Sequence, residues 1–121
     1  AYKLYLGETQ ISQDSLDFSH HPDIIQLSTG SIDCSLGTFF KKTVDESIIF
    51  SFSSVPQNVA YQCYVSIIHN SGTITWPSNV YWENNTPPTL ETNREHLFLF
   101  LTDDGGIKWK ASFSGNYILA V

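Results

Sequence analysis

The chain has 121 residues, a formal net charge of −6, a hydrophobic content of 41% and only 15% charged residues. This length and composition fit one globular domain and exclude a disordered chain, because two domains of half the length could hardly bury stable cores. Only six residues are Lys or Arg, too few for a basic stripe along a phosphate backbone, and no apolar run approaches the roughly 20 residues that span a bilayer. We therefore expect neither a nucleic-acid nor a membrane partner.

The first thirty residues carry little regular pattern. A short strand is expected at residues 2–6, whereas residues 7–30 alternate weakly and include scattered acids. A segment with so few patterned apolar residues gains little by packing on its own domain. We expect residues 1–29 to form an N-terminal arm or edge segment that lies against a neighbouring subunit, and residues 30–121 to form the folded domain.

From residue 31 onward, apolar and polar residues alternate with period two, which is typical of half-buried strands. The apolar series are Ile32-Cys34-Leu36, Ile48-Phe50-Phe52, Tyr61-Cys63-Val65-Ile67 and Ile107-Trp109-Ala111-Phe113. Residues 97–101 are apolar at every position, so this strand is expected to be covered on both faces. No segment of comparable length has the 3.6-residue period of a helix.

Turn residues separate these series. Asn70-Ser71-Gly72 and Asp103-Asp104-Gly105-Gly106 predict tight hairpins, because Gly readily adopts positive φ. Ser114-Gly115-Asn116 is expected to divide the last two strands, and residues 56–58 and 84–88 contain Pro and are expected to be loops. Eight or so strands at this spacing predict an all-β fold, a jelly-roll-like antiparallel β-sandwich with an N-terminal arm. A closed barrel fits the pattern almost as well.

The alternation also predicts which residues form the core. The expected core residues are Trp109, Phe113, Phe98, Phe50 and Ile67. Cys34 and Cys63, the only cysteines, fall on inward positions whether they are bonded or reduced.

The three Trp residues are interpreted as a core and lid cluster, because Trp is usually substantially buried. The alternative is a platform of aromatic side chains that stack on sugar rings. The candidate surface or ligand contacts are then Trp76, Tyr81, Trp82, Asn84 and Asn85.

The remaining groups of reactive residue types match no catalytic or metal-binding pattern. His20-His21-Pro22-Asp23 offers nitrogen and oxygen ligands, but His69 and His96 lie in other segments, and zinc needs a fixed tetrahedron. The stretch at residues 103–106 lacks the ligand spacing of an EF-hand, and the acids at 45–46 and 91–95 are interpreted as solvated loop residues. We therefore expect no enzymatic activity, no cofactor and no bound metal.

The second half of the chain contains a series of short motifs in a definite order. They are Thr73-Ile74-Thr75-Trp76-Pro77, Val80-Tyr81-Trp82, Pro87-Pro88-Thr89-Leu90, residues 98–102, Asp104-Gly105-Gly106, Trp109 and Gly115. Over roughly residues 30–121 this series resembles a module of phage tail fibres and related appendage proteins. Residues 3–11 are similar to short Tyr-Leu-Gly segments of phage tail proteins. The resemblance implies a homotrimeric β-structured protein on the surface of a tailed-phage virion, which binds and assembles and does not catalyse a reaction.

Three functions remain open at this point. The first is a tail fibre or appendage component that mediates attachment or assembly, contacts other virion proteins through its arm and takes host surface polysaccharide as a further partner. The second is a capsid decoration (cement) protein that stabilises the head, a role that suits a small separate chain. Ala1 in a chain without Met is consistent with removal of an initiator Met from a complete small protein. A cloned fragment is the alternative. The third is a carbohydrate-binding module, which needs two or more exposed coplanar aromatic side chains.

Overall fold

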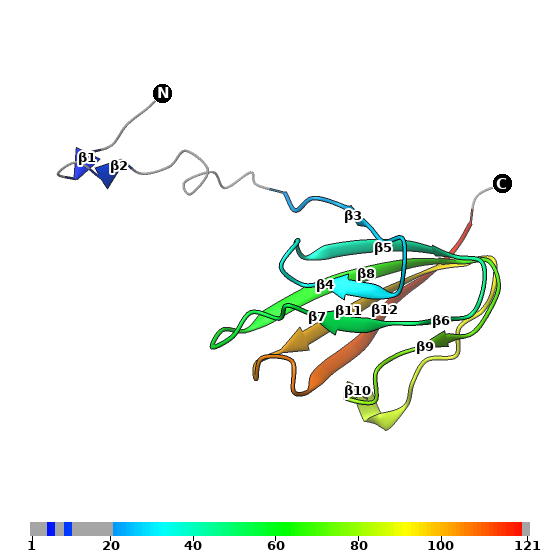
Figure 1. Ribbon diagram of the computed structural model, residues 1–121. Coiled ribbons are helices and arrows are strands. Elements are labelled where there is room, and N and C mark those ends of the chain that lie inside the picture. The colour runs from blue at the N-terminus through cyan, green and yellow to red at the C-terminus, as the bar shows by residue number, and fades with distance from the viewer. Residues whose placement is uncertain (1–4, 7–8, 11–20, 120–121) are drawn as a thin grey trace.

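The computed structural model describes residues 5–6, 9–10 and 21–119, and these form an all-β protein (Figure 1). The strands are β1 (Tyr5–Leu6), β2 (Thr9–Gln10), β3 (Ile25–Gln26), β4 (Ser31–Asp33), β5 (Phe39–Val44), β6 (Ile48–Ile49), β7 (Ser51–Ser53), β8 (Tyr61–His69), β9 (Ile74–Thr75), β10 (Val80–Trp82), β11 (Arg94–Thr102) and β12 (Trp109–Ile118). Among the described residues, one short 3-10 helix, η2 (Glu83–Asn85), follows β10.

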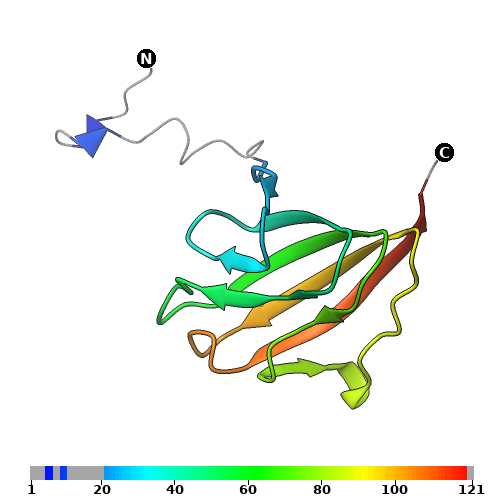
Figure 2. The same cartoon turned by 45° about the vertical axis from the view of Figure 1, so that its right-hand side comes forward.

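The strands form a large sheet with shorter strands over one of its faces. The large sheet has six strands in the order β10-β12-β11-β8-β5-β3. The pairs β4-β7 and β6-β9 lie over one face of this sheet (Figures 1 and 2). β1 pairs with β2 in a separate two-stranded sheet.

The chain passes back and forth between the large sheet and the layer of short strands. In the large sheet, β3 is parallel to β5, and β5 is parallel to β8. Along the chain, β4 lies between β3 and β5, and β6 and β7 lie between β5 and β8; all three belong to the other layer. The pairs β4-β7, β6-β9 and β10-β12 are also parallel, whereas β11 is antiparallel to β8 and to β12. The expectation of an antiparallel arrangement is therefore wrong. Period-two alternation reports which face of a strand is buried and carries no information on the direction of its neighbour.

One extended segment, residues 48–53, joins the two short sheets. The amide of Phe50 donates to the carbonyl of Thr75 at 2.9 Å, and the amide of Ser51 donates to the carbonyl of Gly30 at 2.9 Å. The segment thus changes its hydrogen-bonding partner between these two residues. A Cβ at Gly30 would lie 2.1 Å from the carbonyl oxygen of Ile49, so this close approach of two backbones requires Gly.

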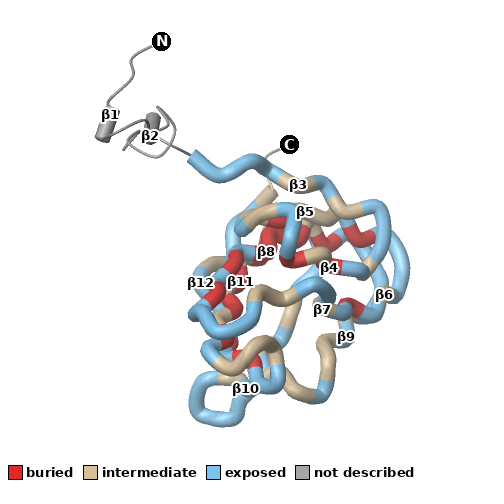
Figure 3. The backbone as a smooth tube through the Cα atoms, turned by 60° about the vertical axis from the view of Figure 1, so that its left-hand side comes forward, coloured by how far each residue is buried: buried red, intermediate tan, exposed pale blue. Residues whose placement is uncertain are grey.

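The core lies between the two layers, and its buried positions are red in Figure 3. Four of the expected core residues are buried: Trp109, Phe98, Phe50 and Ile67. Phe113 is 37% exposed, so its assignment to the core is wrong. Its ring lies 5.4 Å from that of Phe98, with which it is paired across the sheet, but it borders a groove beside η2 and is not covered there.

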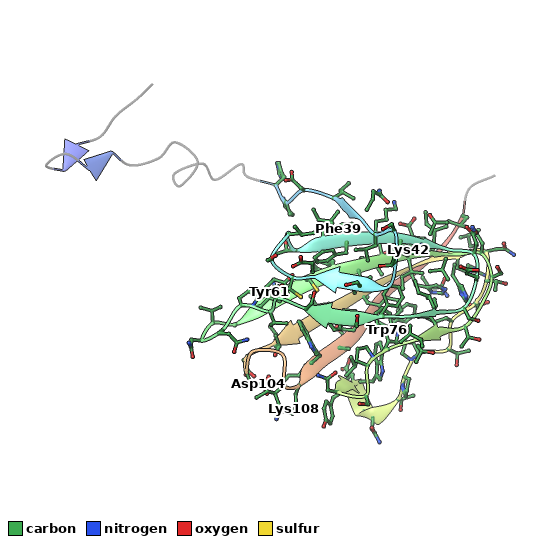
Figure 4. All side chains as sticks on the ribbon, viewed as in Figure 1. Phe39, Lys42, Tyr61, Trp76, Asp104 and Lys108 are labelled. Carbon is green, nitrogen blue, oxygen red and sulfur yellow. The ribbon has the colours of Figure 1, made fainter. Side chains whose placement is uncertain are left out.

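The expected hairpin at residues 103–106 is confirmed. It joins β11 to β12, with Gly105 and Gly106 at φ values of 71° and 89°. The Asp104 carboxylate accepts hydrogen bonds from the Lys108 amide at 3.0 Å and the Thr102 hydroxyl at 2.9 Å. Asp104 and Lys108 are labelled in Figure 4. These hydrogen bonds lower the pKa of Asp104, and the one from the Lys108 amide has the largest effect. The carboxylate therefore organises the turn.

The other two expected turns differ from the prediction. Residues 70–72 do not close a hairpin, because β9 pairs with β6 in the layer opposite β8. Gly72 has a φ of 92°, and a Cβ there would lie 2.2 Å from the carbonyl carbon of Glu46, so this crossover depends on Gly.

Residues 114–116 lie within the continuous strand β12, where the ladder with β11 shifts register. Two residues expected on inward strand faces, Leu36 and Ile107, lie in turns and are 58% and 71% exposed.

The segment expected to be an arm or edge segment, residues 1–29, includes β3. Ile25 and Leu27 pack against the core, and the amide of Leu27 donates to the carbonyl of Lys41 at 2.8 Å. Residues 25–27 therefore belong to the edge of the large sheet. Most of the segment before residue 21 lies outside the described residues, and so does the larger part of the strand expected at residues 2–6.

Trp109 provides a test of the assigned faces of β12. Its ring stacks on Phe52 at a centroid distance of 4.2 Å, and only 1% of the residue is exposed. Trp109→Ala should lower the free energy of unfolding by about 3–5 kcal/mol, as for other large buried aromatic residues. Lys108→Ala, at an exposed position in the preceding turn, should change it by less than about 0.5 kcal/mol. Denaturant melts measure both values, and equal effects would contradict the inward position of Trp109.

Candidate functional site

The outer face of the large sheet has an apolar centre and is not covered by the layer of short strands. Leu97, Leu99 and Leu101 of β11 point to this face and are half-buried, because the short strands all lie over the opposite face (Figures 1 and 2). The expectation that residues 97–101 are covered on both sides is therefore wrong for the isolated chain. An apolar strand at the centre of a sheet normally has a covering layer on each face.

Neighbouring strands extend this apolar surface. Cross-strand register places Phe39 beside Tyr64 and Tyr64 beside Leu99, and the rings of Phe39 and Tyr64 are 6.3 Å apart. Figure 4 shows Phe39 on β5. Tyr64 is 38% exposed. We call Phe39, Tyr64, Leu97 and Leu99 the outer apolar patch.

The charged groups beside the outer apolar patch neutralise one another. The Lys41 ammonium lies 3.4 Å from the Glu95 carboxylate, which also accepts a hydrogen bond of 2.6 Å from the Ser66 hydroxyl. The Ser66 hydrogen bond, with a smaller contribution from Lys41, lowers the pKa of Glu95. The patch can thus be buried against another surface without leaving an unpaired charge.

A groove lies at the β10 edge of the large sheet, partly on the same outer face and partly beside η2. It consists of two hollows of about 390 and 340 Å³ that share four lining residues: Trp82, Glu83, Ala111 and Ser112. The first hollow extends to Tyr81, Leu99, Leu101 and Lys110, and the second to Asn84, Thr86, Pro88 and Phe113. We call the two hollows the β10–β12 groove.

Parallel pairing of β10 with β12 builds the groove. Tyr81 is paired with Lys110 and therefore points to the outer face, where it is 56% exposed. Trp82 points inward, and its ring lies 5.8 Å from that of Phe98. The chain then turns away from the sheet through η2, where Asn84 adopts a φ of 56°, a left-handed conformation that Asn tolerates well.

The residues that we expected to contact a ligand do not lie together on one surface. Trp76 is partly buried and packs against the core, with its ring stacked on Phe50 at 4.6 Å and at 4.8 Å from Phe100 (Figure 4). Tyr81, Trp82 and Asn84 border the groove, and Asn85 is exposed beside it. Lys110, Ser112 and Thr86 were not expected there, because nothing in the local sequence indicates that β12 pairs with β10.

Two buried histidines hold the loop before β11 near the groove. The His69 ring nitrogens lie 3.1 Å from the Glu91 carbonyl and 2.7 Å from the Gly72 carbonyl. Nε2 of His96 lies 2.8 Å from the same Glu91 carbonyl, while its Nδ1 is buried without a partner. The two rings therefore fix the position of Glu91 at the end of the loop that carries Pro88.

The two cysteines are buried free thiols close to Tyr61. The Tyr61 hydroxyl donates to the Gly37 carbonyl at 2.6 Å. Burial raises the pKa of the Cys63 thiol to about 12, with a smaller contribution from Cys34, whose own pKa is also raised by burial. At neutral pH both groups are therefore unionised thiols within the core.

The described residues contain no group of three or more His, Cys, Asp or Glu side chains that could hold a metal ion. His21 and Asp23 are exposed, and His20 lies outside the described residues. No helix in this part of the chain is long and apolar enough to cross a membrane. No protein-family model matches the chain, and no curated protein or solved structure is significantly similar to it.

The raised thiol pKa predicts how stability depends on pH. In the unfolded chain Cys63 ionises near its ordinary pKa of 9.0, whereas in the folded protein its pKa is about 12. The unfolded state therefore loses its proton first, and the free energy of unfolding should fall between these values by up to about 1.4 kcal/mol per pH unit.

Denaturant melts from neutral to alkaline pH test this expectation. Cys63→Val, which removes the ionisable group and keeps an apolar side chain, should make the alkaline decrease shallower. An identical pH dependence in the variant would contradict the assignment to Cys63.

Proposed function

We propose that this protein is a structural component on the exterior of a tailed-phage virion, a homotrimer in a tail fibre or other appendage that mediates attachment or assembly. The motif series at residues 73–115 suggested this role. The observation that carries the proposal is the outer apolar patch, since a cluster of partly exposed apolar side chains on a soluble protein often marks an interaction site. The function is one of binding, with no catalytic step.

Charge supports another copy of the chain as the occupant of the patch. The chain carries a formal net charge of −6, which opposes association through surfaces rich in acids. On the outer face, Lys41 compensates Glu95, and Lys110 lies 3.7 Å from Asp103. Subunits that associate through this face therefore do not bring uncompensated carboxylates close together.

The C-terminal end of β12 offers a further apolar surface for assembly. Tyr117 and Ile118 are 53% and 77% exposed. We propose that these residues extend the contact between subunits. We also propose that the two layers of strands form a β-sandwich, whose large sheet contains both parallel and antiparallel pairs.

A capsid decoration protein is the second candidate, because the same patch would suit a trimer attached to the head. The arm would then clamp adjacent capsid subunits. A density map of the particle separates the two candidates, since it places the chain either at the capsid or at the tail.

A substitution in the outer apolar patch tests the assembly. The wild-type chain should have the mass of a trimer in light scattering at tens of micromolar, and Tyr64→Glu should shift it to monomer by placing a charge in the contact. Ile49→Glu is the matched control, because Ile49 is 74% exposed on the layer of short strands. A monomeric wild type, or dissociation by both substitutions, would overturn the role of the patch.

Removal of residues 1–20 tests the arm. The deletion retains β3 and the core, so circular dichroism should show a folded protein. Co-sedimentation with particles that lack the native copy should then fail, because the arm is proposed to contact other virion proteins. Co-sedimentation equal to that of the full chain would place the attachment surface within residues 21–121.

A further inference from the structure

The β10–β12 groove combines an apolar floor with a polar rim. Leu99 and Leu101 contribute the apolar part, and Glu83, Thr86 and Ser112 bring a carboxylate and two hydroxyl groups to the lining. Such a combination suits a ligand that presents both C–H surface and hydroxyl groups. Pyranose rings have this character, since one ring face is mainly C–H and the edge carries hydroxyls.

Tyr81 supplies an aromatic side chain that is available to a ligand. It is 56% exposed at the first hollow, whereas Trp76 and Trp82 are partly buried and pack against the core. Phe113, at 37% exposure, lines the second hollow. Each hollow thus contains a partly exposed aromatic residue, and Tyr81 is the one that lies on the outer face of the sheet.

The charges at the groove select among glycans. Among the described residues, Glu83 takes part in none of the ion pairs, so its carboxylate is free to accept hydrogen bonds from hydroxyl groups. Lys110, the cation of the lining, lies 3.7 Å from Asp103 and is already paired. With a net charge of −6 and a single cation in the lining, which lies beside Asp103, the protein disfavours anionic glycans.

We infer that the β10–β12 groove binds a neutral polysaccharide, with Tyr81 stacking on a pyranose ring and Glu83, Thr86 and Ser112 hydrogen-bonding its hydroxyls. This inference goes beyond the proposed structural role, because it assigns a ligand class to a surface distinct from most of the outer apolar patch. Glycan binding and subunit mass are separate measurements. Failure of either one therefore leaves the other proposal standing.

Affinity electrophoresis in native gels tests the inference. The probes are dextran, mannan and galactan as neutral polysaccharides and alginate as the anionic one. At least one neutral polysaccharide should retard the wild-type protein. Tyr81→Ala should weaken the interaction by roughly tenfold or more, as expected from the loss of about 1.4 kcal/mol, and Tyr81→Phe should retain most of it because the ring is kept.

Ile49→Ala is the control, because Ile49 is also an exposed apolar residue, at 74%, and lies neither in the groove nor in the proposed contact between subunits. Circular dichroism verifies that each variant is folded. Retardation by alginate alone, no retardation by any neutral polysaccharide, or equal losses in Tyr81→Ala and Ile49→Ala would each overturn the inference.

Discussion

Aromatic stacking between the two layers is the interaction on which the rest of the structure depends. Phe52 of β7 stacks on Trp109 of β12 at 4.2 Å, and Trp76, which follows β9, has its ring 4.8 Å from that of Phe100 of β11. These contacts attach the short strands to the large sheet, since the two layers share no ladder of hydrogen bonds. Because the short strands are fixed over one face, the opposite face of the sheet is left open for other contacts.

The open face divides into two regions with different chemistry. Around Tyr64 it is apolar, and its charges are compensated by pairing between Lys41 and Glu95. Beside Tyr81 it is hollowed and has a polar rim. A rigid sheet that presents both regions can hold a neighbouring subunit and a soluble ligand at fixed positions relative to one another.

The sequence was sufficient for those features that depend on neighbouring residues. Alternation along residues 61–67 correctly predicts the buried face of β8, and Gly105 and Gly106 correctly predict the hairpin before β12. It was insufficient for features set by distant pairing. The parallel direction of β10 and β12, which brings Tyr81 beside Lys110, has no local signature, and neither does the crossover at Gly72. Phe113 shows the same limit, because its inward position was predictable from the pattern but the lack of a covering element was not.

The parallel ladders have a consequence for how the chain folds. Phe39 pairs with Tyr64, and Ile48 with Ile74, so each of these ladders closes only after a long stretch of intervening chain has been ordered. Such non-local contacts form slowly, whereas β11 and β12 are joined by a short turn and can pair early. Folding should therefore nucleate at the C-terminal hairpin and add β8 and then β5. During synthesis, β5 therefore emerges from the ribosome before the strands that complete its sheet have been made.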